Sequence, residues 1–194
     1  MIEIHLIRHG KTHANEKRLY CGHTDIPLSE NGAEEVGALR DKKIYPAADA
    51  FYSSGLLRAG QTLKIIYGDV EYKIAAGLSE YNFGAFEMKG YEELKKRDDY
   101  LNWINDSTGE VACPGGESGN GFSKRVIGEY MNIVGEARSN GTKSTAVFAH
   151  GGVITRLMDY LFPGERNFYE WQPGSGRGYT VFLDGGHACG YRAI

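Results

Sequence analysis

The chain has 194 residues, of which 41% are hydrophobic and 24% charged. These values are typical of a globular domain and exclude a disordered chain, and the length predicts one domain, residues 1–194, with a substantial core. The formal net charge of −3 argues against a general nucleic-acid-binding protein, which would present a basic face.

The cysteines and the start of the chain predict a cytoplasmic location. Cys21, Cys113 and Cys189 are scattered and form no CxxC pair, which indicates reduced thiols. No basic and apolar leader precedes the first predicted strand, and no apolar run is long enough to span a membrane. We therefore expect a cytoplasmic protein with no membrane partner.

The apolar pattern predicts strands and helices that alternate along the chain. An apolar run predicts a buried strand at 2–7, and Ser29 is a typical N-cap for an amphipathic helix that ends near residue 43. Further strands are predicted at 49–53, 72–75 and 144–149, and helices at 56–67, 91–103, 122–137 and 152–161. A surface loop is predicted at 105–121, and a closing hairpin has strands at 179–183 and 188–192. This order predicts an α/β fold, a three-layer α/β/α sandwich with a mostly parallel central sheet.

The triplet Gly10-Lys11-Thr12 resembles the end of a phosphate-binding loop of nucleotide hydrolases. That loop requires a glycine five residues before its Gly-Lys pair, so that backbone N–H groups can surround the phosphates. The residue at this position is His5, inside the first predicted strand. The triplet therefore does not indicate a nucleotide site.

Cationic and imidazole side chains follow the predicted parallel strands. Arg8 and His9 follow the first strand, Arg58 follows the second, and His150 follows the strand at 144–149. Because the carboxyl ends of parallel strands meet at one edge of a sheet, these side chains are expected to converge there.

This set of side chains suits phosphoryl transfer. Two arginines can bind a phosphate dianion, a neutral imidazole can attack phosphorus, and a second imidazole can stabilise the charge on the equatorial oxygens. Glu80, in a loop after the third strand, is the expected acid for the departing alkoxide. The spacing of His5, His9 and His13 could suggest zinc, but on a strand leading into a loop these side chains need not converge, so no metal and no other cofactor is predicted.

Four segments in order, "LIRHGKTHAN", "YSSGLLRAGQT", "LSEYNFGAFE" and "FAHGG", resemble the signatures of the histidine phosphatase superfamily, in its phosphoglycerate-mutase-like branch. The resemblance implies that His9 is the phosphorylated nucleophile, that Arg8, Arg58 and His150 form the phosphate pocket, and that Glu80 is the proton donor. It also implies substrate-binding positions at Asn15, Cys21, Gly22 and Gly151. The stretches "LYCGHTDIPLSENG" and "CPGGES" look most like the α-ribazole phosphatases of cobalamin biosynthesis.

Some positions depart from the family pattern. Gly55 stands where the second motif usually has proline, and Phe86 and Met88 stand where the third usually has tryptophan and glycine. None of these changes removes a chemical group, so they concern the rim of the pocket and not its chemistry.

Three functions remain open. The first is a metal-independent phosphomonoesterase that acts through a phosphohistidine on a small phosphorylated metabolite, with α-ribazole 5′-phosphate as one candidate. The second is a cofactor-dependent phosphoglycerate mutase, and the third is a catalytically idle phospho-ligand-binding protein. The third is disfavoured because every chemical group is present. Only one long helix pair is predicted between Glu80 and His150, and the sequence stops at Ile194, soon after the last predicted strand, so we expect an open pocket, which favours hydrolysis over mutase chemistry.

Overall fold

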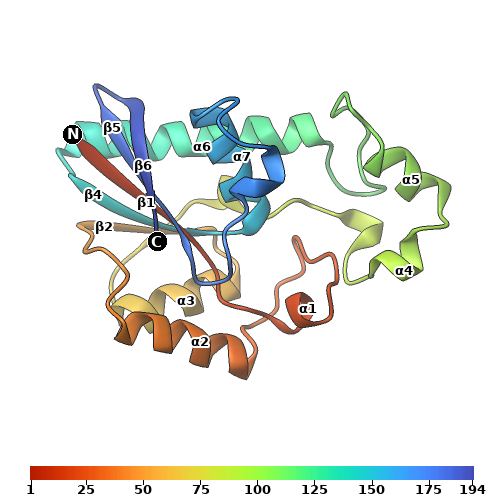
Figure 1. Ribbon diagram of the computed structural model, residues 1–194, viewed down its shortest axis with the longest axis horizontal. Helices are drawn as coiled ribbons and strands as arrows, with labels where there is room; N and C mark the ends of the chain where they lie inside the picture. Colours follow the sequence, from red (N-terminus) through yellow and green to blue (C-terminus); the bar gives the residue numbers. More distant parts are fainter.

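The computed structural model describes residues 1–194 and is built around a six-stranded sheet with the order β3-β2-β4-β1-β5-β6 (Figure 1). The strands are β1 (Ile2–Arg8), β2 (Ala50–Ser53), β3 (Lys73–Ile74), β4 (Ser144–Ala149), β5 (Gly178–Asp184) and β6 (His187–Ala193). β3, β2, β4 and β1 pair in parallel, whereas β5 is antiparallel to both β1 and β6. The mostly parallel sheet is confirmed, with the predicted hairpin at one edge.

Helices cover both faces of this sheet, as the three-layer prediction requires. α2 and α3 lie on one side of the sheet, and α6 and α7 lie on the other (Figure 1). The helices are α1 (His13–Glu16), α2 (Glu30–Asp41), α3 (Leu57–Tyr67), α4 (Tyr91–Leu94), α5 (Asp98–Ile104), α6 (Gly119–Asn140) and α7 (Gly151–Leu161), with 3₁₀ turns η1 (Ala76–Leu78), η2 (Gly84–Phe86) and η3 (Phe168–Trp171). None of them is long and apolar enough to span a membrane.

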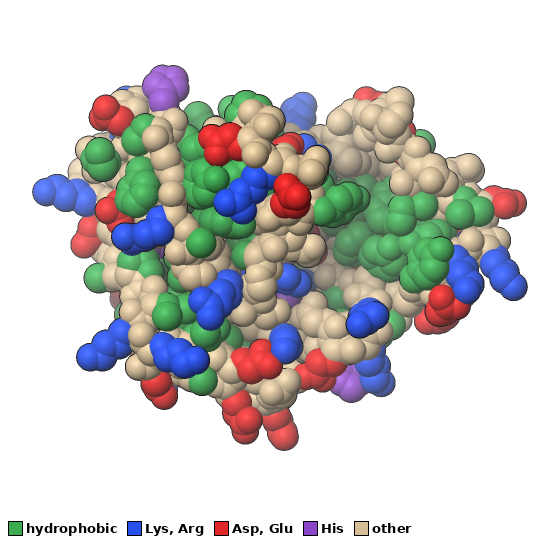
Figure 2. Space-filling model, in the orientation of Figure 1, with side chains coloured by type: hydrophobic (Ala, Val, Ile, Leu, Met, Phe, Trp, Pro, Cys, Tyr) green, Lys and Arg blue, Asp and Glu red, His purple; other side chains and the backbone are tan.

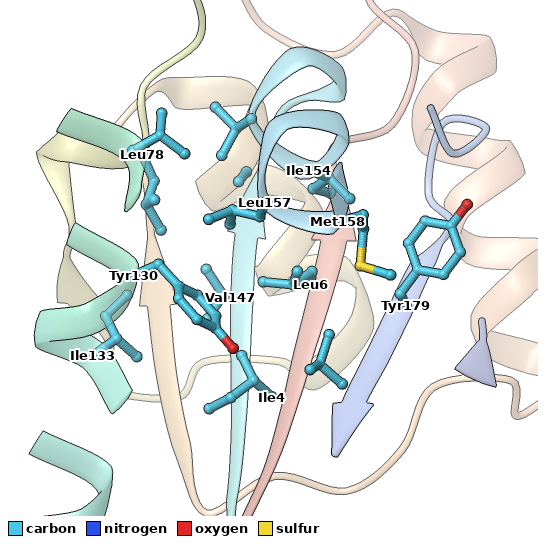
Figure 3. Close-up of a cluster of buried hydrophobic side chains, with 14 of the residues drawn as sticks. Ile4, Leu6, Leu78, Tyr130, Ile133, Val147, Ile154, Leu157, Met158 and Tyr179 are labelled. Carbon is cyan, nitrogen blue, oxygen red and sulfur yellow. The ribbon is translucent and has the colours of Figure 1, made fainter. Parts of the chain in front are cut away.

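Alternate residues of the central strands fill the two layers of the core. Leu6 and Val147 belong to the cluster under α6 and α7, whereas Ile7 and Phe148 pack with α2 and α3, because successive side chains of a strand point to opposite faces. Figure 3 shows the first cluster, in which side chains of α6 and α7 lie against Leu6 and Val147. This packing fixes α7, whose N-cap is His150, against the carboxyl end of the sheet.

A smaller aromatic cluster lies beside the sheet, in the segment that carries α4 and α5 (Figure 1). Phe86, Leu94, Tyr100 and Cys113 are buried in it, and half-buried aromatic rings surround them. The segment is therefore anchored by a core of its own, and it forms one wall beside the end of the sheet.

The helix predicted at 91–103 is wrong, because the chain breaks it into α4 and α5. Arg97 is the N-cap residue of α5 and has an extended backbone. Its guanidinium pairs with Asp99 in the first turn of α5, where the helix dipole favours a carboxylate. The segment predicted as one helix thus contains a helix boundary at Arg97.

The loop predicted at 105–121 ends earlier than expected, because α6 begins at Gly119. The Ser118 hydroxyl caps this helix by accepting a hydrogen bond from the Gly121 N–H. Glycines in the first turn suggested a loop, but the serine cap overrides their low helix propensity.

Candidate active site

The carboxyl ends of three adjacent strands bring the predicted catalytic residues together. β1 leads into Arg8 and His9, β2 leads into Ser54, and β4 leads into His150. The rings of His9 and His150 have centroids 5.1 Å apart and planes inclined at 60°. The topological argument from the sequence therefore places these imidazoles correctly.

His9 presents a fixed tautomer. Its Nδ1 lies 2.6 Å from the carbonyl oxygen of Gly10, and since a carbonyl can only accept, Nδ1 carries the proton and Nε2 carries the lone pair. Burial, with Arg58 and Arg8 nearby, lowers the pKa of His9 to about 3. The ring is therefore neutral at physiological pH, as a nucleophile must be.

His150 is fully buried behind the same site. Its Nε2 lies 2.8 Å from the Ser54 hydroxyl, and its Nδ1 has no hydrogen-bond partner. Burial, and then the neighbouring His9, Arg58 and Arg8, hold the pKa of His150 well below its ordinary value. A buried ring nitrogen without a partner is unfavourable, so this side of His150 is suited to meet a ligand.

Arg58 is buried and links the first two motifs. It donates from Nη1 to the Thr24 carbonyl (3.0 Å) and from Nη2 to the Gly22 carbonyl (2.7 Å). The hydroxyl of Thr62 donates to the Arg58 carbonyl and accepts from the Gly10 N–H. These bonds hold the loop after His9 and the helix that carries Arg58 in one register.

Arg8 is held by the segment between η3 and β5. Its Nη1 donates to the carbonyl of Pro173 at 2.7 Å, while its Nε is buried and has no partner. Burial lowers the pKa of Arg8, and the charge of Glu80 partly offsets the effect. The free Nε, like the free Nδ1 of His150, is the kind of group that an anion would satisfy.

Glu80 lies at the N-terminus of α7. Its carboxylate accepts hydrogen bonds from the Tyr81 N–H and the Gly152 N–H, both at 2.9 Å. A Cβ at residue 152 would lie 2.5 Å from the carboxylate oxygen, so a larger residue there would displace the Glu80 side chain from this position. A Cβ at residue 151 would lie 2.8 Å from Gln172 Nε2 and would displace that side chain.

The other predicted binding residues lie along the loop that follows β1. Asn15 accepts from the Thr12 N–H and hydroxyl through Oδ1 and so completes a capping box with Thr12, the N-cap residue of α1. Cys21 is half-buried, and its thiol faces the Thr24 carbonyl. The Gly22 carbonyl accepts a hydrogen bond from Arg58, and the Gly22 N–H donates to the carboxylate of Glu87. Substrate contact by Asn15, Cys21 and Gly22 stays a prediction.

Glu87 is an anchor that the sequence did not reveal. Its two oxygens accept from the backbone of Gly22, His23, Thr24 and Phe83 and from the Thr24 hydroxyl. These donors outweigh burial and lower the pKa of Glu87. The glutamate of "FGAFE" therefore acts as a fixed carboxylate that holds the loop after Cys21.

Other supporting residues were also missed by the motif pattern. Ser54 orients His150, Thr62 joins two motifs, and Arg125 donates to the backbone around Glu80. Ser54 lies within the second motif, directly after the second predicted strand, so its position could have indicated a residue near the site. Arg125 gave none, because the backbone carbonyls around Glu80 to which it donates are far from it in sequence.

The histidines outside the site have other surroundings. His5 is buried in the sheet between the hydroxyls of Thr180 and Ser144, as expected of a core histidine. His13 is exposed and lies beside Glu16. No group of three or more His, Cys, Asp or Glu side chains is positioned to hold a metal ion.

The family model of the histidine phosphatase superfamily (branch 1) matches residues 4–181. The chain belongs to this superfamily. The adenosylcobalamin/alpha-ribazole phosphatase of Escherichia coli (strain K12) is 33% identical over 169 residues, which cover 80% of this chain and 77% of the relative. The 2,3-bisphosphoglycerate-dependent phosphoglycerate mutase of Beijerinckia indica is 32% identical over 171 residues, covering 80% of this chain and 79% of the relative.

Solved structures agree with this assignment. The crystal structure of the alpha-ribazole phosphatase from Shigella flexneri has a TM-score of 0.83 and 26% identity, covering 96% of this chain and 93% of that one. The phosphoglycerate mutase from Bacillus anthracis, at 22% identity and a TM-score of 0.81 over 100% of this chain and 91% of that one, shares the fold. The resemblance in the sequence, including the phosphoglycerate-mutase-like fold, is confirmed.

Two departures from the superfamily pattern lie at positive φ. Gly55 has φ +90°, which proline, fixed near −65°, cannot adopt, so the turn after β2 could not hold a proline in this conformation. Met88 has φ 58°, in the left-handed region that favours the glycine usual in the superfamily. Its N–H donates to the Tyr20 carbonyl at 2.7 Å, which holds this conformation.

A pocket of about 430 Å³ adjoins Glu80 and Gly152. Figure 2 shows hydrophobic side chains gathered on the α4–α5 side of the molecule, next to a hollow in the surface. The apolar residues that line the pocket are Tyr20, Tyr81, Phe83, Trp103, Ile104, Val111, Phe122, Phe168 and Tyr169. The superfamily site thus opens directly onto an aromatic pocket.

Proposed function

We propose that the protein is a phosphomonoesterase of the histidine phosphatase type that forms a phosphohistidine at His9. One observation carries the proposal. The Nδ1 proton of His9 is held by Gly10, and its pKa is lowered to about 3, so Nε2 is a neutral nucleophile facing the site of Arg8, Arg58 and His150.

The first step forms a bond from His9 Nε2 to phosphorus and breaks the bond from phosphorus to the alcohol oxygen. The guanidiniums of Arg8 and Arg58 and the ring of His150 stabilise the equatorial oxygens. Glu80 gives its proton to the departing oxygen. In the second step Glu80 takes a proton from water, whose oxygen forms a bond to phosphorus as the bond from phosphorus to His9 Nε2 breaks. This releases inorganic phosphate and returns His9 to its neutral form and Glu80 to its protonated form.

The charges of the aromatic pocket favour an uncharged leaving group. Arg156 is the one cationic side chain that lines it, and this guanidinium pairs with Asp159 (3.1 Å) and lies over the ring of Phe168 (4.6 Å). Glu80 and Asp106 add negative charge. A second anionic group, such as the carboxylate of 3-phosphoglycerate, would lie near these two carboxylates, and the only cation within its reach would be Arg156, whose Nη1 already pairs with Asp159 and whose buried Nε has no partner.

These features support a ring-bearing alcohol as the leaving group, since half-buried Tyr20, Phe83 and Trp103 offer faces for stacking. α-Ribazole 5′-phosphate is the candidate that the named relatives suggest. In this proposal, binding and cleavage of the small-molecule substrate need no metal ion, because Arg8 and Arg58 supply the positive charge around the phosphate.

A rapid-quench experiment tests the mechanism. With ³²P-labelled phosphomonoester, the wild-type protein should form an acid-labile, base-stable phosphoprotein that His9→Ala cannot form. His13→Ala is the matched control, since this exposed histidine lies four residues away and should leave labelling unchanged. Label that persists in His9→Ala would refute the mechanism, and phosphoryl transfer to a second phosphoglycerate in place of water would indicate a mutase.

Glu80→Gln tests the acid. An alkoxide needs a proton as it departs and a nitrophenolate does not, so the variant should slow phosphorylation by alkyl phosphates by about 10²–10⁴-fold and by 4-nitrophenyl phosphate much less. Single-turnover kinetics on α-ribazole 5′-phosphate, 3-phosphoglycerate and 4-nitrophenyl phosphate provide the comparison. Equal losses for all leaving groups would place the acid elsewhere.

A further inference from the structure

Glu80 lies in a segment with no regular structure of its own. η1 ends at Leu78, and residues 79–82 belong to no helix or strand. The position of the Glu80 carboxyl therefore depends on what holds this backbone in place. The main contact comes from α6, through the side chain of Arg125.

Arg125 uses every nitrogen of its guanidinium in this region. Nη1 donates to the carbonyls of Gly77 (2.9 Å) and Ser79 (2.7 Å), and Nη2 donates to the carbonyl of Glu80 (2.8 Å). Nε and Nη2 also donate to the two carboxylate oxygens of Glu117, at 2.9 and 2.5 Å. A planar fork of fixed donors is specific to arginine, and a lysine ammonium cannot reproduce it.

Glu117 completes the connection on the far side of the segment. Its Oε1 accepts from the Asn82 N–H at 2.7 Å, and its carbonyl accepts from the Tyr81 hydroxyl at 2.7 Å. The guanidinium of Arg125 lies 5.0 Å from the ring centroid of Phe122. The side chains of Arg125 and Glu117 are only 25% and 18% exposed, so solvent screens their pairing weakly.

A second ion pair that involves α6, between Glu136 of this helix and Lys73 of β3, lacks these features. Lys73 and Glu136 are 63% and 47% exposed, and their contacts are with each other and with Tyr52, away from the site. Arg125 and Glu117 instead contact the backbone on both sides of Glu80. Their arrangement is matched to the acid segment, and a general stabilising role would not require it.

We propose that Arg125 and Glu117 are positioning residues for proton transfer, which fix the backbone of residues 77–82 so that the Glu80 carboxyl meets the departing oxygen. This inference rests on the proposed function, in which Glu80 is the acid. A displacement of about 1 Å in a reacting group costs about 10²-fold in rate. Loosening the segment should therefore slow the steps that need the proton and spare those that do not.

The test compares leaving groups in Arg125→Lys and in the milder Glu117→Gln. Arg125→Lys should slow single-turnover phosphorylation by an alkyl phosphate by about 10–10²-fold, and by 4-nitrophenyl phosphate less than about threefold. Inhibition by vanadate should be unchanged, since the phosphate pocket is untouched. Glu136→Gln is the control on the same helix and should behave as wild type.

A double-mutant cycle separates positioning from general loosening. When Glu80→Gln is already present, Arg125→Lys should cause no further loss with alkyl phosphates, because both changes remove the same proton transfer. A further loss in that background, or equal losses for both leaving groups, overturns the inference while the hydrolase stands. If Arg125→Lys does not fold, the same cycle with Glu117→Gln decides. Wild-type protein that hydrolyses no phosphomonoester overturns the proposed function itself.

Discussion

The low pKa of His9 makes the stability of the fold depend on pH. In the unfolded chain this imidazole takes up a proton near its ordinary pKa of 6.5, whereas in the folded protein it does so only near about 3. Between these values the unfolded state binds more protons than the folded state. Acid therefore favours unfolding, and the stability contributed by a neutral His9 is lost as pH falls below 6.5.

The magnitude follows from the two pKa values. Each pH unit between them costs about 1.4 kcal/mol, so lowering the pH from 7.5 to 5.0 should reduce the free energy of unfolding by about 2 kcal/mol through His9 alone. His9 is buried, so solvent screening does not diminish this contribution to stability. His150 and His5 have lowered pKa values as well and act in the same direction.

Urea unfolding of wild type and His9→Gln at pH 7.5 and pH 5.0 measures the contribution of His9 to the free energy of unfolding. The variant removes the titrating ring, so its loss of stability between the two pH values should be smaller than that of wild type by about 2 kcal/mol. His13→Gln, at an exposed histidine, should lose as much as wild type. If His9→Gln and wild type lose the same amount, His9 titrates as an ordinary imidazole and the argument for a neutral nucleophile by burial is wrong.

Three further predictions follow from the site. Activity should survive EDTA and be inhibited by vanadate, because Arg8 and Arg58 supply the positive charge; loss in EDTA that zinc or manganese restores would contradict this. Met88→Gly should raise the free energy of unfolding in urea by about 1 kcal/mol, because the left-handed φ of 58° no longer opposes a side chain; an unchanged or lower value would contradict it. Glu87→Gln should speed hydrogen exchange of the Gly22 and Thr24 amides, and protection equal to wild type would show that Glu87 does not hold this loop.

The sheet and the meeting of His9 with His150 could be predicted because their signals are local. β1 and β4 are rich in apolar residues, and a histidine follows each strand directly, His9 after β1 and His150 after β4. Parallel pairing then forces the ends of neighbouring strands to one edge, so His9 and His150 meet without any knowledge of loop structure. The roles of these residues in catalysis stay predictions of the proposed mechanism.

The helix boundaries were harder to predict from the sequence, because they depend on single hydrogen bonds. The apolar spacing over 91–103 fits one helix, yet the pairing of Arg97 with Asp99 starts a new helix inside it. The start of α6 depends on the Ser118 hydroxyl, whose effect outweighs the glycines that follow. In both cases a side-chain contact a few residues away overrides the periodic pattern.

Glu80 and Glu87 show why the chemistry of a site cannot be assigned from its motif alone. Both stand in the one segment "LSEYNFGAFE", and either could supply a carboxyl group. The structure separates them by their donors, since Glu87 is surrounded by backbone amides that keep it ionised, whereas Glu80 accepts only from Tyr81 and Gly152 beside the open pocket. An acid must hold a proton before the reaction and be able to release it, so a carboxylate fixed by many donors is suited to structure and a sparsely bonded one to proton transfer. The assignment of Glu80 thus depends on how each carboxylate is bonded, which only the folded chain determines.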